Sequence, residues 1–420
     1  MRTRLTEILQ IEHPVMLAGM GGVSYSELAA AVSNGGGFGC LGASTMSNDR
    51  MEQEIAATKA LTDRPFGVDL LTAAPGDMEA QVELIVAGGA TVFAAGLGVP
   101  SKVIDQCHDN NIIVVNICGK VRHAIAAVEA GCDIVVAQGT EAGGHTGQVA
   151  TMALVPQVVD AVGDRVPVVA AGGLYDGRGL AAALALGADG VWVGTRFIAT
   201  PEAYGVRGYK DLLLGAKEDS TVISRGFTGK TCRVLRNDYT QYWEEHPDEL
   251  QPFPQQFIRS MNDGANHLGL GLDDDRVDPN KEFFPAGQGV GGINELVPAA
   301  ELVQRFVTEA EEILDRVAAH GCWRKRPVVR PQGGQAYIGT KAARWRQRSK
   351  HPFESDACRR PCKARVLRRR PSAELRTHIP PNDSQFAERT PRRTDDVVRL
   401  PEQPQLHHGI FDRNRVSAIE

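Results

Sequence analysis

The stretch Ala137–Gly147, with the sequence AQGTEAGGHTG, follows a short apolar run and is rich in glycine. The preceding residues, 134–136, have the β-branched apolar character of a buried strand. The glycines make continuation of that strand unfavourable and permit positive φ angles. We therefore expect His145 at a strand end, above a backbone that a planar ligand can approach, where it can act as base, donor or cation. The alternative is a solvated loop histidine.

Similar apolar runs recur along the first half of the chain. They are spaced by roughly 20 to 30 residues, as in a repeated β-α unit. Such runs favour a parallel sheet buried on both faces, and about eight of them favour a closed (β/α)8, or TIM, barrel over an open doubly wound sheet. The runs are Val15–Leu17, Phe38–Leu41, Phe66–Leu71, Thr91–Ala95, Ile112–Ile117, Ile134–Ala137, Val166–Ala171 and Val191–Phe197.

Helical patterns fill the intervals between the runs. We expect Gly35, Gly88, Gly131 and Gly187 to supply left-handed caps at four helix ends. A last amphipathic segment, Val297–Val317, would close the ring. The other patterns are Ser24–Ser33, Asp49–Leu61, Met78–Ala87, Ser101–Asn110, Val121–Ala130, Met152–Val162 and Arg178–Leu186.

The loops after the predicted strands carry the candidate chemistry, because all of them face the same end of a barrel. The first loop, residues 18–22 (AGMGG), has almost no side chains, and the third run contains Asp69. The seventh and eighth runs lead into Gly172-Gly173 and Gly194-Thr195, where backbone N–H groups can hold a phosphate. The alternative is two tight turns. A Rossmann site is excluded because the glycines at 35–39 precede a strand instead of following one.

Composition indicates a globular enzyme, with 42% hydrophobic residues and 45 glycines. The first residues lack a signal-peptide core, and no uncharged apolar run reaches about 18 residues. We therefore expect a cytoplasmic protein without a membrane partner. Cys358 and Cys362 have no second Cys/His pair at ligand spacing, so we expect no metal.

Two further regions follow the barrel repeats. Residues 201–285 lose the β-α rhythm and carry scattered aromatics, and we expect a helical lid over the loop end, with a peripheral decoration as the alternative. The turn at 286–292 can reach back to a ligand and contains Gln288. The predicted barrel domain is therefore residues 1–200 together with 286–320.

The last region, residues 321–420, differs in charge. About 23 of the 46 Lys and Arg residues but about 10 of the 51 acidic residues fall there, so its net charge is roughly +13 (23 − 10) within a chain of net charge -5. Its Arg/Pro-rich composition predicts a disordered tail. A nucleic-acid-binding tail is one interpretation. The absence of interleaved aromatics argues against that partner, and an extended or out-of-frame reading of the gene is the interpretation we favour.

Several motifs, in chain order, resemble the nitronate monooxygenase family, once called 2-nitropropane dioxygenase. They span about residues 1 to 320. The resemblance implies a TIM barrel that binds FMN without a covalent link. It also implies oxidation of a small alkyl nitronate, or a nitroalkane, by O2 to a carbonyl compound and nitrite. The motifs are PVMLAGMGG (14–22), PFGVDLL (65–71), AQGTEAGGHTGQVATMALVPQV (137–158), VPVVAAGGLYDG (166–177), GVWVGTRFI (190–198) and PAGQGVGG (285–292).

The same resemblance assigns roles to individual residues, with His145 as the catalytic residue. The glycines of the first loop would lie near the isoalloxazine, and the last two strand ends would hold the phosphate. The implied cofactor-binding residues are Gly19, Met20, Gly21, Asp69, Gln138, Gly172, Gly173, Gly194, Thr195 and Gln288. Many relatives have asparagine where this chain has Asp69, which would place a negative charge near the flavin or substrate unless it is paired.

Two other functions stay open. The motifs also resemble the flavin-dependent enoyl-acyl-carrier-protein reductase, which shares the loop histidine and the pattern TMxLVxQV, here Thr151–Val158. In that enzyme NAD(P)H reduces FMN, and His145 would assist protonation of an enoyl thioester. A non-catalytic flavin-binding protein is the alternative of another class. A barrel like inosine monophosphate dehydrogenase would need a nucleophilic cysteine where this loop has His145. A homodimer also stays open.

Overall fold

The computed structural model of the chain describes residues 1–73, 76–267 and 277–319. Its main sheet has eight parallel strands in the order β1-β9-β8-β6-β5-β4-β3-β2. A parallel bridge between Met16 and Phe38 brings the first strand beside the second. The result is a nearly closed (β/α)8 barrel, as the sequence predicted. Its strands are β1 (Val15–Leu17), β2 (Gly39–Gly42), β3 (Phe66–Leu71), β4 (Val92–Gly96), β5 (Ile113–Cys118), β6 (Ile134–Gln138), β8 (Val168–Ala171) and β9 (Gly190–Val193).

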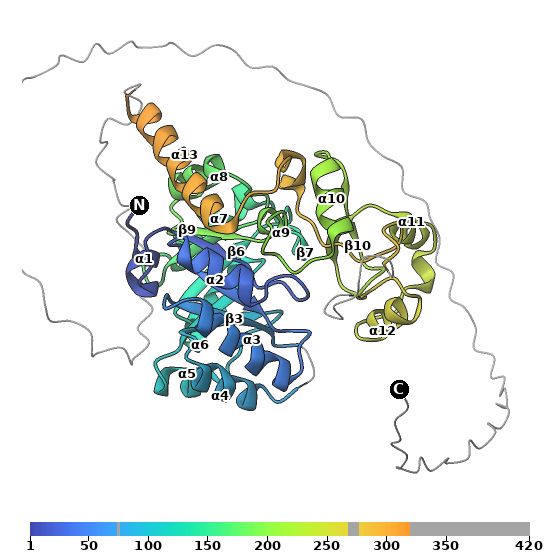
Figure 1. The fold of residues 1–420 in the computed structure, drawn as a ribbon, viewed down its shortest axis with the longest axis horizontal. Coiled ribbons are helices and arrows are strands. Elements are labelled where there is room, and N and C mark those ends of the chain that lie inside the picture. Colours follow the sequence, from blue (N-terminus) through green and yellow to red (C-terminus); the bar gives the residue numbers. More distant parts are fainter. Residues whose placement is uncertain (74–75, 268–276, 320–420) are drawn as a thin grey trace, which may run out of the picture. The chain divides into compact units, whose positions relative to one another are not determined.

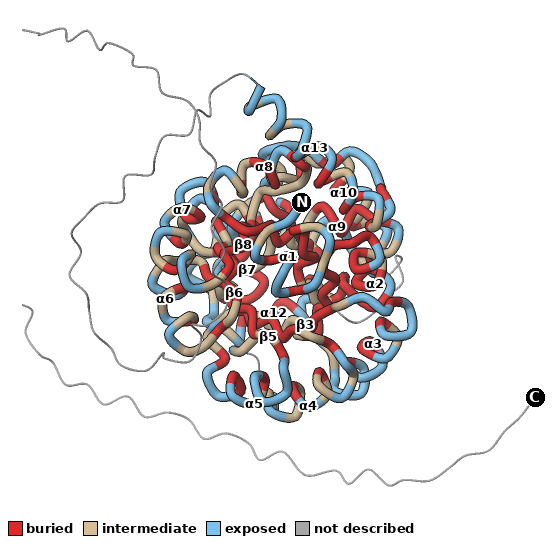
Figure 2. Tube along the Cα trace, turned by 90° about the vertical axis from the view of Figure 1, so that its left-hand side faces the viewer, coloured by how far each residue is buried: buried red, intermediate tan, exposed pale blue. Residues whose placement is uncertain are grey.

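Helices surround this sheet, as the end-on view in Figure 2 shows. The longest, α13 (Ala299–Ala319), packs against α8 and α2 and completes the ring. The remaining helices of the ring follow the predicted patterns closely. They are α2 (Ser26–Asn34), α3 (Asn48–Leu61), α4 (Met78–Gly88), α5 (Ile104–Asp109), α6 (Val121–Ala130), α7 (Thr151–Val162) and α8 (Gly177–Ala185).

Each strand contributes to two cores, because successive side chains of a strand point to opposite faces. Val68 and Leu70 of β3 pack outward among the helices. Cys40 of β2 and Ala94 of β4 belong to a second cluster inside the barrel. Asp69 alternates with Val68 and Leu70, so its side chain is directed inward.

The N-terminal helix α1 (Arg4–Leu9) was not predicted from the sequence. Leu5 and Leu9 are buried in the inner cluster, and Figure 2 shows α1 across the middle of the barrel end. Arg4 forms an ion pair with Asp189 (2.6 Å), just before β9. Six residues give too short a periodic pattern to identify such a helix.

The helix caps show which glycine adopts the left-handed conformation. Gly131 (φ 108°) and Gly187 (φ 92°) do so as predicted. The predictions for Gly35 and Gly88 were wrong by one residue, because both keep right-handed backbone and the following residues, Gly36 (φ 85°) and Gly89 (φ 77°), turn left-handed. The left-handed residue lies beyond the last helical one, so paired glycines cannot be assigned from sequence alone.

The last strand is also shorter than predicted. The apolar run continues to Phe197, but β9 ends at Val193 and residues 195–198 form the short helix α9 (Thr195–Ile198). Gly194 (φ −107°, ψ −79°) leaves the extended region and ends the strand. The side chain of Phe197 is buried in the outer core, which explains why a helical segment has the composition of a strand.

The insertion at residues 201–285 contains strands as well as the predicted helices. Strands β10 (Thr221–Ser224) and β11 (Cys232–Leu235) form an antiparallel sheet with β7 (Gly144–His145) in the order β10-β11-β7. Figure 1 shows α10, α11 and α12 gathered on one side of the barrel. The helices of the insertion are α10 (Arg207–Gly215), α11 (Asp238–Glu245), η1 (Pro247–Glu249) and α12 (Gln255–Asn262).

The predicted tail at 321–420, with Cys358 and Cys362, lies outside the described residues. Within the described part of the chain, no helix has the length and hydrophobicity needed to span a bilayer. The described residues also include no cluster of three or more histidine, cysteine or acidic side chains that could hold a metal ion.

Candidate active site

A cavity of about 1280 Å³ lies at the carboxyl ends of the barrel strands. It is larger than the roughly 300–1,000 Å³ of typical small-molecule sites. The predicted site residues that line it are Gly19, Met20, Gly21, Asp69, Gln138, His145, Gly172, Gly173, Gly194 and Thr195. Gln288 is not brought into the cavity, since its side chain is exposed and its neighbours Gly287 and Gly289 form the lining instead.

His145 lies in a short strand rather than in a free loop. The glycines end pairing within the barrel sheet, as expected, but Gly144 and His145 then pair with Arg233 and Cys232 of β11. Gln138 donates its Nε2–H to the His145 carbonyl oxygen (2.7 Å). The insertion and the end of β6 therefore hold the histidine backbone from two sides.

The His145 imidazole contacts the insertion through Nε2, which lies 3.1 Å from Thr228 Oγ1. Burial lowers its pKa to about 4, and the nearby charge of Lys230 adds to the effect. Burial disfavours the imidazolium because the low-dielectric surroundings solvate it poorly. The resting ring is therefore neutral at neutral pH, so of the three roles considered it can start as a base or a donor but not as a standing cation.

This lowered pKa gives a testable prediction. The imidazole should stay neutral as the pH falls from 8 to 5 and should titrate near 4. Because the folded pKa lies below the unfolded value of about 6.5, the stability that depends on neutral His145 is complete above about pH 6.5 and is lost as the pH falls through 4. Histidine-selective NMR can measure this titration, with His145→Asn to assign the signal. A midpoint near 6.5 would contradict the predicted burial.

Asp69 lies on the cavity floor beside the first loop. Its Oδ1 is shielded from solvent and has no hydrogen-bond partner. The side chain fills the space next to Gly19, where an added Cβ would lie 2.1 Å from Asp69 Cβ. Burial raises the pKa of Asp69 well above its ordinary value. The negative charge expected at this position is therefore disfavoured.

The predicted phosphate loops converge with the turn at 286–292. Gly172 (φ 104°) and Gly173 (φ 74°) both have positive φ, which side chains other than glycine rarely adopt. Thr195 Oγ1 accepts a hydrogen bond from the Gly287 N–H (2.9 Å), and a Cβ on Gly289 would lie 3.0 Å from the Gly173 oxygen. Backbone from three segments therefore forms a cradle with few side chains, which suits a phosphate group.

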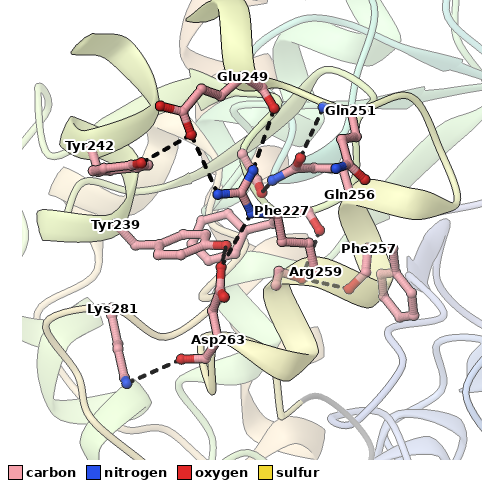
Figure 3. A network of polar contacts seen from close by, with 12 residues as sticks. Phe227, Tyr239, Tyr242, Glu249, Gln251, Gln256, Phe257, Arg259, Asp263 and Lys281 are labelled. Carbon is pink, nitrogen blue, oxygen red and sulfur yellow. Dashed lines mark hydrogen bonds and ion pairs between the residues drawn. The ribbon is translucent and has the colours of Figure 1, made fainter. Parts of the chain in front are cut away.

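The α12 helix of the insertion adds an apolar wall to the cavity. Phe257, Ile258 and Met261 line it, and Ile258 and Met261 are 53% and 43% exposed. On this helix Arg259 contacts Glu249 (3.5 Å) and Asp263 (3.9 Å). Figure 3 shows Phe257 pointing away from this polar network. The network fixes the helix while leaving its apolar side chains free to contact a ligand.

Several polar residues in or next to this site were not predicted from the sequence, among them Thr228 in the lining and Glu141 beside it. Thr228 contacts His145 from 83 positions further along the chain, and an isolated loop threonine gives no local signal of such a contact. Glu141 accepts from the N–H and hydroxyl of Thr151 (2.7 and 2.6 Å). It thereby ties the glycine-rich stretch to the start of α7. Glu141 lies ten residues before Thr151 and is not the N-cap of α7, so no local capping pattern indicates this contact.

Known proteins are similar to this chain in sequence and in fold. The family model described as nitronate monooxygenase matches residues 2–83 and 75–309. The (3aS,4S,5R,7aS)-5-hydroxy-7a-methyl-1-oxo-octahydro-1H-indene-4-carboxyl-CoA dehydrogenase of Mycobacterium tuberculosis is 42% identical, over 76% of this chain and 99% of that protein. A probable nitronate monooxygenase of Staphylococcus saprophyticus is 35% identical over 75% and 99%. The structure of FabK from Thermotoga maritima has a TM-score of 0.70 and 34% identity, over 76% and 99%.

The fold together with these similarities defines the class as a flavin-dependent oxidoreductase built on a TIM barrel. The chain belongs to the nitronate monooxygenase family. The resemblance found in the sequence motifs is thereby confirmed at the level of the family, together with the likeness to the sister family.

Proposed function

We propose that the cavity binds FMN, with the phosphate in the cradle of Gly172, Gly173, Gly194 and Thr195. The cradle supports this choice because the Gly173 and Gly289 backbones approach each other where any side chain would intrude. Met20 and the flanking glycines would face the isoalloxazine. Flavin released by heat from the purified protein should migrate with FMN; release of FAD would contradict the proposal.

We further propose that the enzyme oxidises alkyl nitronates, and nitroalkanes after loss of their α proton. The observation that supports this most is the neutral His145 imidazole on the cavity wall. A neutral imidazole can accept the α proton of a nitroalkane. When bound, the flavin supplies the acceptor for the electrons of the nitronate, and O2 completes conversion to a carbonyl compound and nitrite.

The hydrogen bonds of Thr228 indicate which imidazole nitrogen acts. The Thr228 hydroxyl donates to the Lys230 carbonyl oxygen (3.2 Å). Its oxygen is then the acceptor toward His145 Nε2 (3.1 Å), which favours the tautomer with the proton on Nε2. The lone pair is left on Nδ1, and we infer that Nδ1 takes the substrate proton.

Product analysis tests this function directly. Purified protein mixed with propionate 3-nitronate in air should consume O2 and release nitrite, and heat-denatured protein should not. An absence of both, from protein that carries its full flavin, would contradict nitronate oxidation.

Thr228→Val should weaken catalysis without removing the cofactor. It deletes the hydrogen bond that orients His145, worth about 0.5–1.5 kcal/mol, so turnover of a nitroalkane should fall up to about tenfold. Thr62→Val is the control, because Thr62 donates a similar hydrogen bond to Asn34 (2.6 Å) away from the cavity. Steady-state kinetics and the flavin-to-protein ratio measure both variants. Equal losses in the two would show that Thr228 has only a structural role.

We infer that residues 201–285 act as a lid over the flavin. The observation in support is that Thr228, Phe253 and Phe257 of this insertion line the cavity. Substrate should therefore protect the insertion from hydrogen exchange. Unchanged exchange with substrate bound would argue for a peripheral decoration.

A second candidate function is oxidation or reduction of an acyl thioester. The apolar α12 wall and the basic Lys120 line the same cavity, a combination that suits an acyl chain with an anionic carrier. The CoA-thioester dehydrogenase from M. tuberculosis is 42% identical to this chain. Flavin reduction by a saturated acyl-CoA, or crotonyl thioester turnover with NADPH, would favour this candidate over nitronate oxidation.

A further inference from the structure

Asp69 lines the cavity, and one of its carboxyl oxygens has no hydrogen-bond partner in the protein. We propose that Asp69 acts as a hydrogen-bond donor to the ring edge of the bound flavin. The proposal rests on flavin binding in the cavity but not on nitronate as the substrate.

The neighbours of Asp69 in the barrel fix where its side chain lies. It lies in β3 opposite Gly42 of β2 and Ala94 of β4, so its neighbours in the sheet offer no side-chain partner. Gly19 fits so closely against the carboxyl that a Cβ there would lie 2.7 Å from Asp69 Oδ2. The side chain therefore has little freedom to turn away from the cavity.

The protein around Asp69 provides no group that would stabilise a negative charge on its carboxyl. Asp69 Oδ1 is buried without a partner, and the described part of the chain offers Asp69 no ion pair. Asp69 interacts electrostatically with the thiol of Cys40 inside the barrel. Burial raises the pKa of that thiol well above its ordinary value, so Cys40 is neutral too. The side chain as a whole is half-buried, but a carboxylate would place its shielded Oδ1 without a counter-charge or hydrogen-bond donor, which is costly, whereas a protonated carboxyl is neutral.

The consequence for a ligand follows from hydrogen-bond chemistry. A carboxylate can only accept, and a protonated carboxyl can also donate. A flavin presents mainly acceptor atoms along its pyrimidine edge, so a protonated Asp69 matches that edge and an ionised one would repel it.

Asp69→Asn tests the proposal, because it keeps shape and donor but cannot ionise. At pH 7 the two proteins should have reduction equilibrium constants for bound flavin within about threefold of each other, measured by anaerobic titration with dithionite and a reference dye. A tenfold easier reduction of the variant, about 30 mV for a two-electron couple, would show that wild-type Asp69 carries a charge and would overturn the proposal.

Infrared spectroscopy gives a readout that needs neither turnover nor the variant's potential. Wild-type holoprotein at pH 7 should show the C=O stretch of a protonated carboxyl, which should vanish on raising the pH and be missing in Asp69→Asn. Asp77→Asn, which changes an exposed carboxyl at the start of α4, should leave the band in place. A wild-type spectrum without this band would overturn the proposal even if nitronate oxidation is confirmed.

Discussion

Replacing His145 with asparagine should abolish most turnover of a neutral nitroalkane while flavin stays bound. A positioned general base contributes about 10²- to 10⁴-fold, so nitroethane turnover should fall by at least about 100-fold. The preformed nitronate needs no deprotonation and loses only a hydrogen-bonding partner, so its oxidation should fall by about tenfold or less. Steady-state kinetics with nitroethane and ethyl nitronate measure the two effects.

The difference between the two substrates is what identifies the base. Equal losses for nitroethane and its nitronate would show that His145 only binds the anion. Loss of flavin from His145→Asn, with a normal rate in the remaining holoprotein, would show that the histidine is structural. The unaltered backbone contact between Gln138 and the His145 carbonyl makes retention of the flavin the expected result.

Gly19→Ala should remove most flavin binding. The new methyl group would lie 2.1 Å from Asp69 Cβ and 2.7 Å from its Oδ2, so the first loop or β3 must move. Such overpacking costs about 1–3 kcal/mol, and a moved loop no longer supports the ring, so the dissociation constant for FMN should rise about five- to 150-fold. Fluorescence titration of the apoprotein with FMN measures this change.

Gly208→Ala provides the matched control for that substitution. Gly208 lies in α10, and an added Cβ would meet no atom within 4 Å. Alanine is the better helix former, so this variant should bind FMN normally and melt at the same or a higher temperature. Normal FMN affinity in Gly19→Ala would contradict the close packing of the first loop against Asp69.

The parts of the fold that depend on local patterns were predictable. The runs that became β3 and β6 were identifiable because strands buried on both faces are continuously apolar. The order of the runs was then enough to place Gly19, Asp69 and Gly173 at one end of a barrel, since all strand ends of a parallel barrel point the same way. The predicted end of the last strand was wrong because Phe197 is apolar in order to pack in the outer core and does not pair in the sheet.

The parts that depend on distant contacts were not predictable. Pairing of β7 with β11 joins segments that have no common local signal, and the contact of Thr228 with His145 arises from that pairing. The lowered pKa of His145 and the raised pKa of Asp69 come mainly from burial, which single residues do not reveal. The sequence therefore identified the candidate groups but not their protonation states.

We propose above all that this flavoprotein takes electrons from an alkyl nitronate. Anaerobic mixing of the purified holoprotein with propionate 3-nitronate, followed by flavin absorbance in a stopped-flow instrument, isolates that electron transfer. We expect the nitronate alone to bleach the flavin and O2 to restore the absorbance. A flavin that stays oxidised with the nitronate but is reduced by NADPH, with turnover of crotonyl thioester, would contradict the claim.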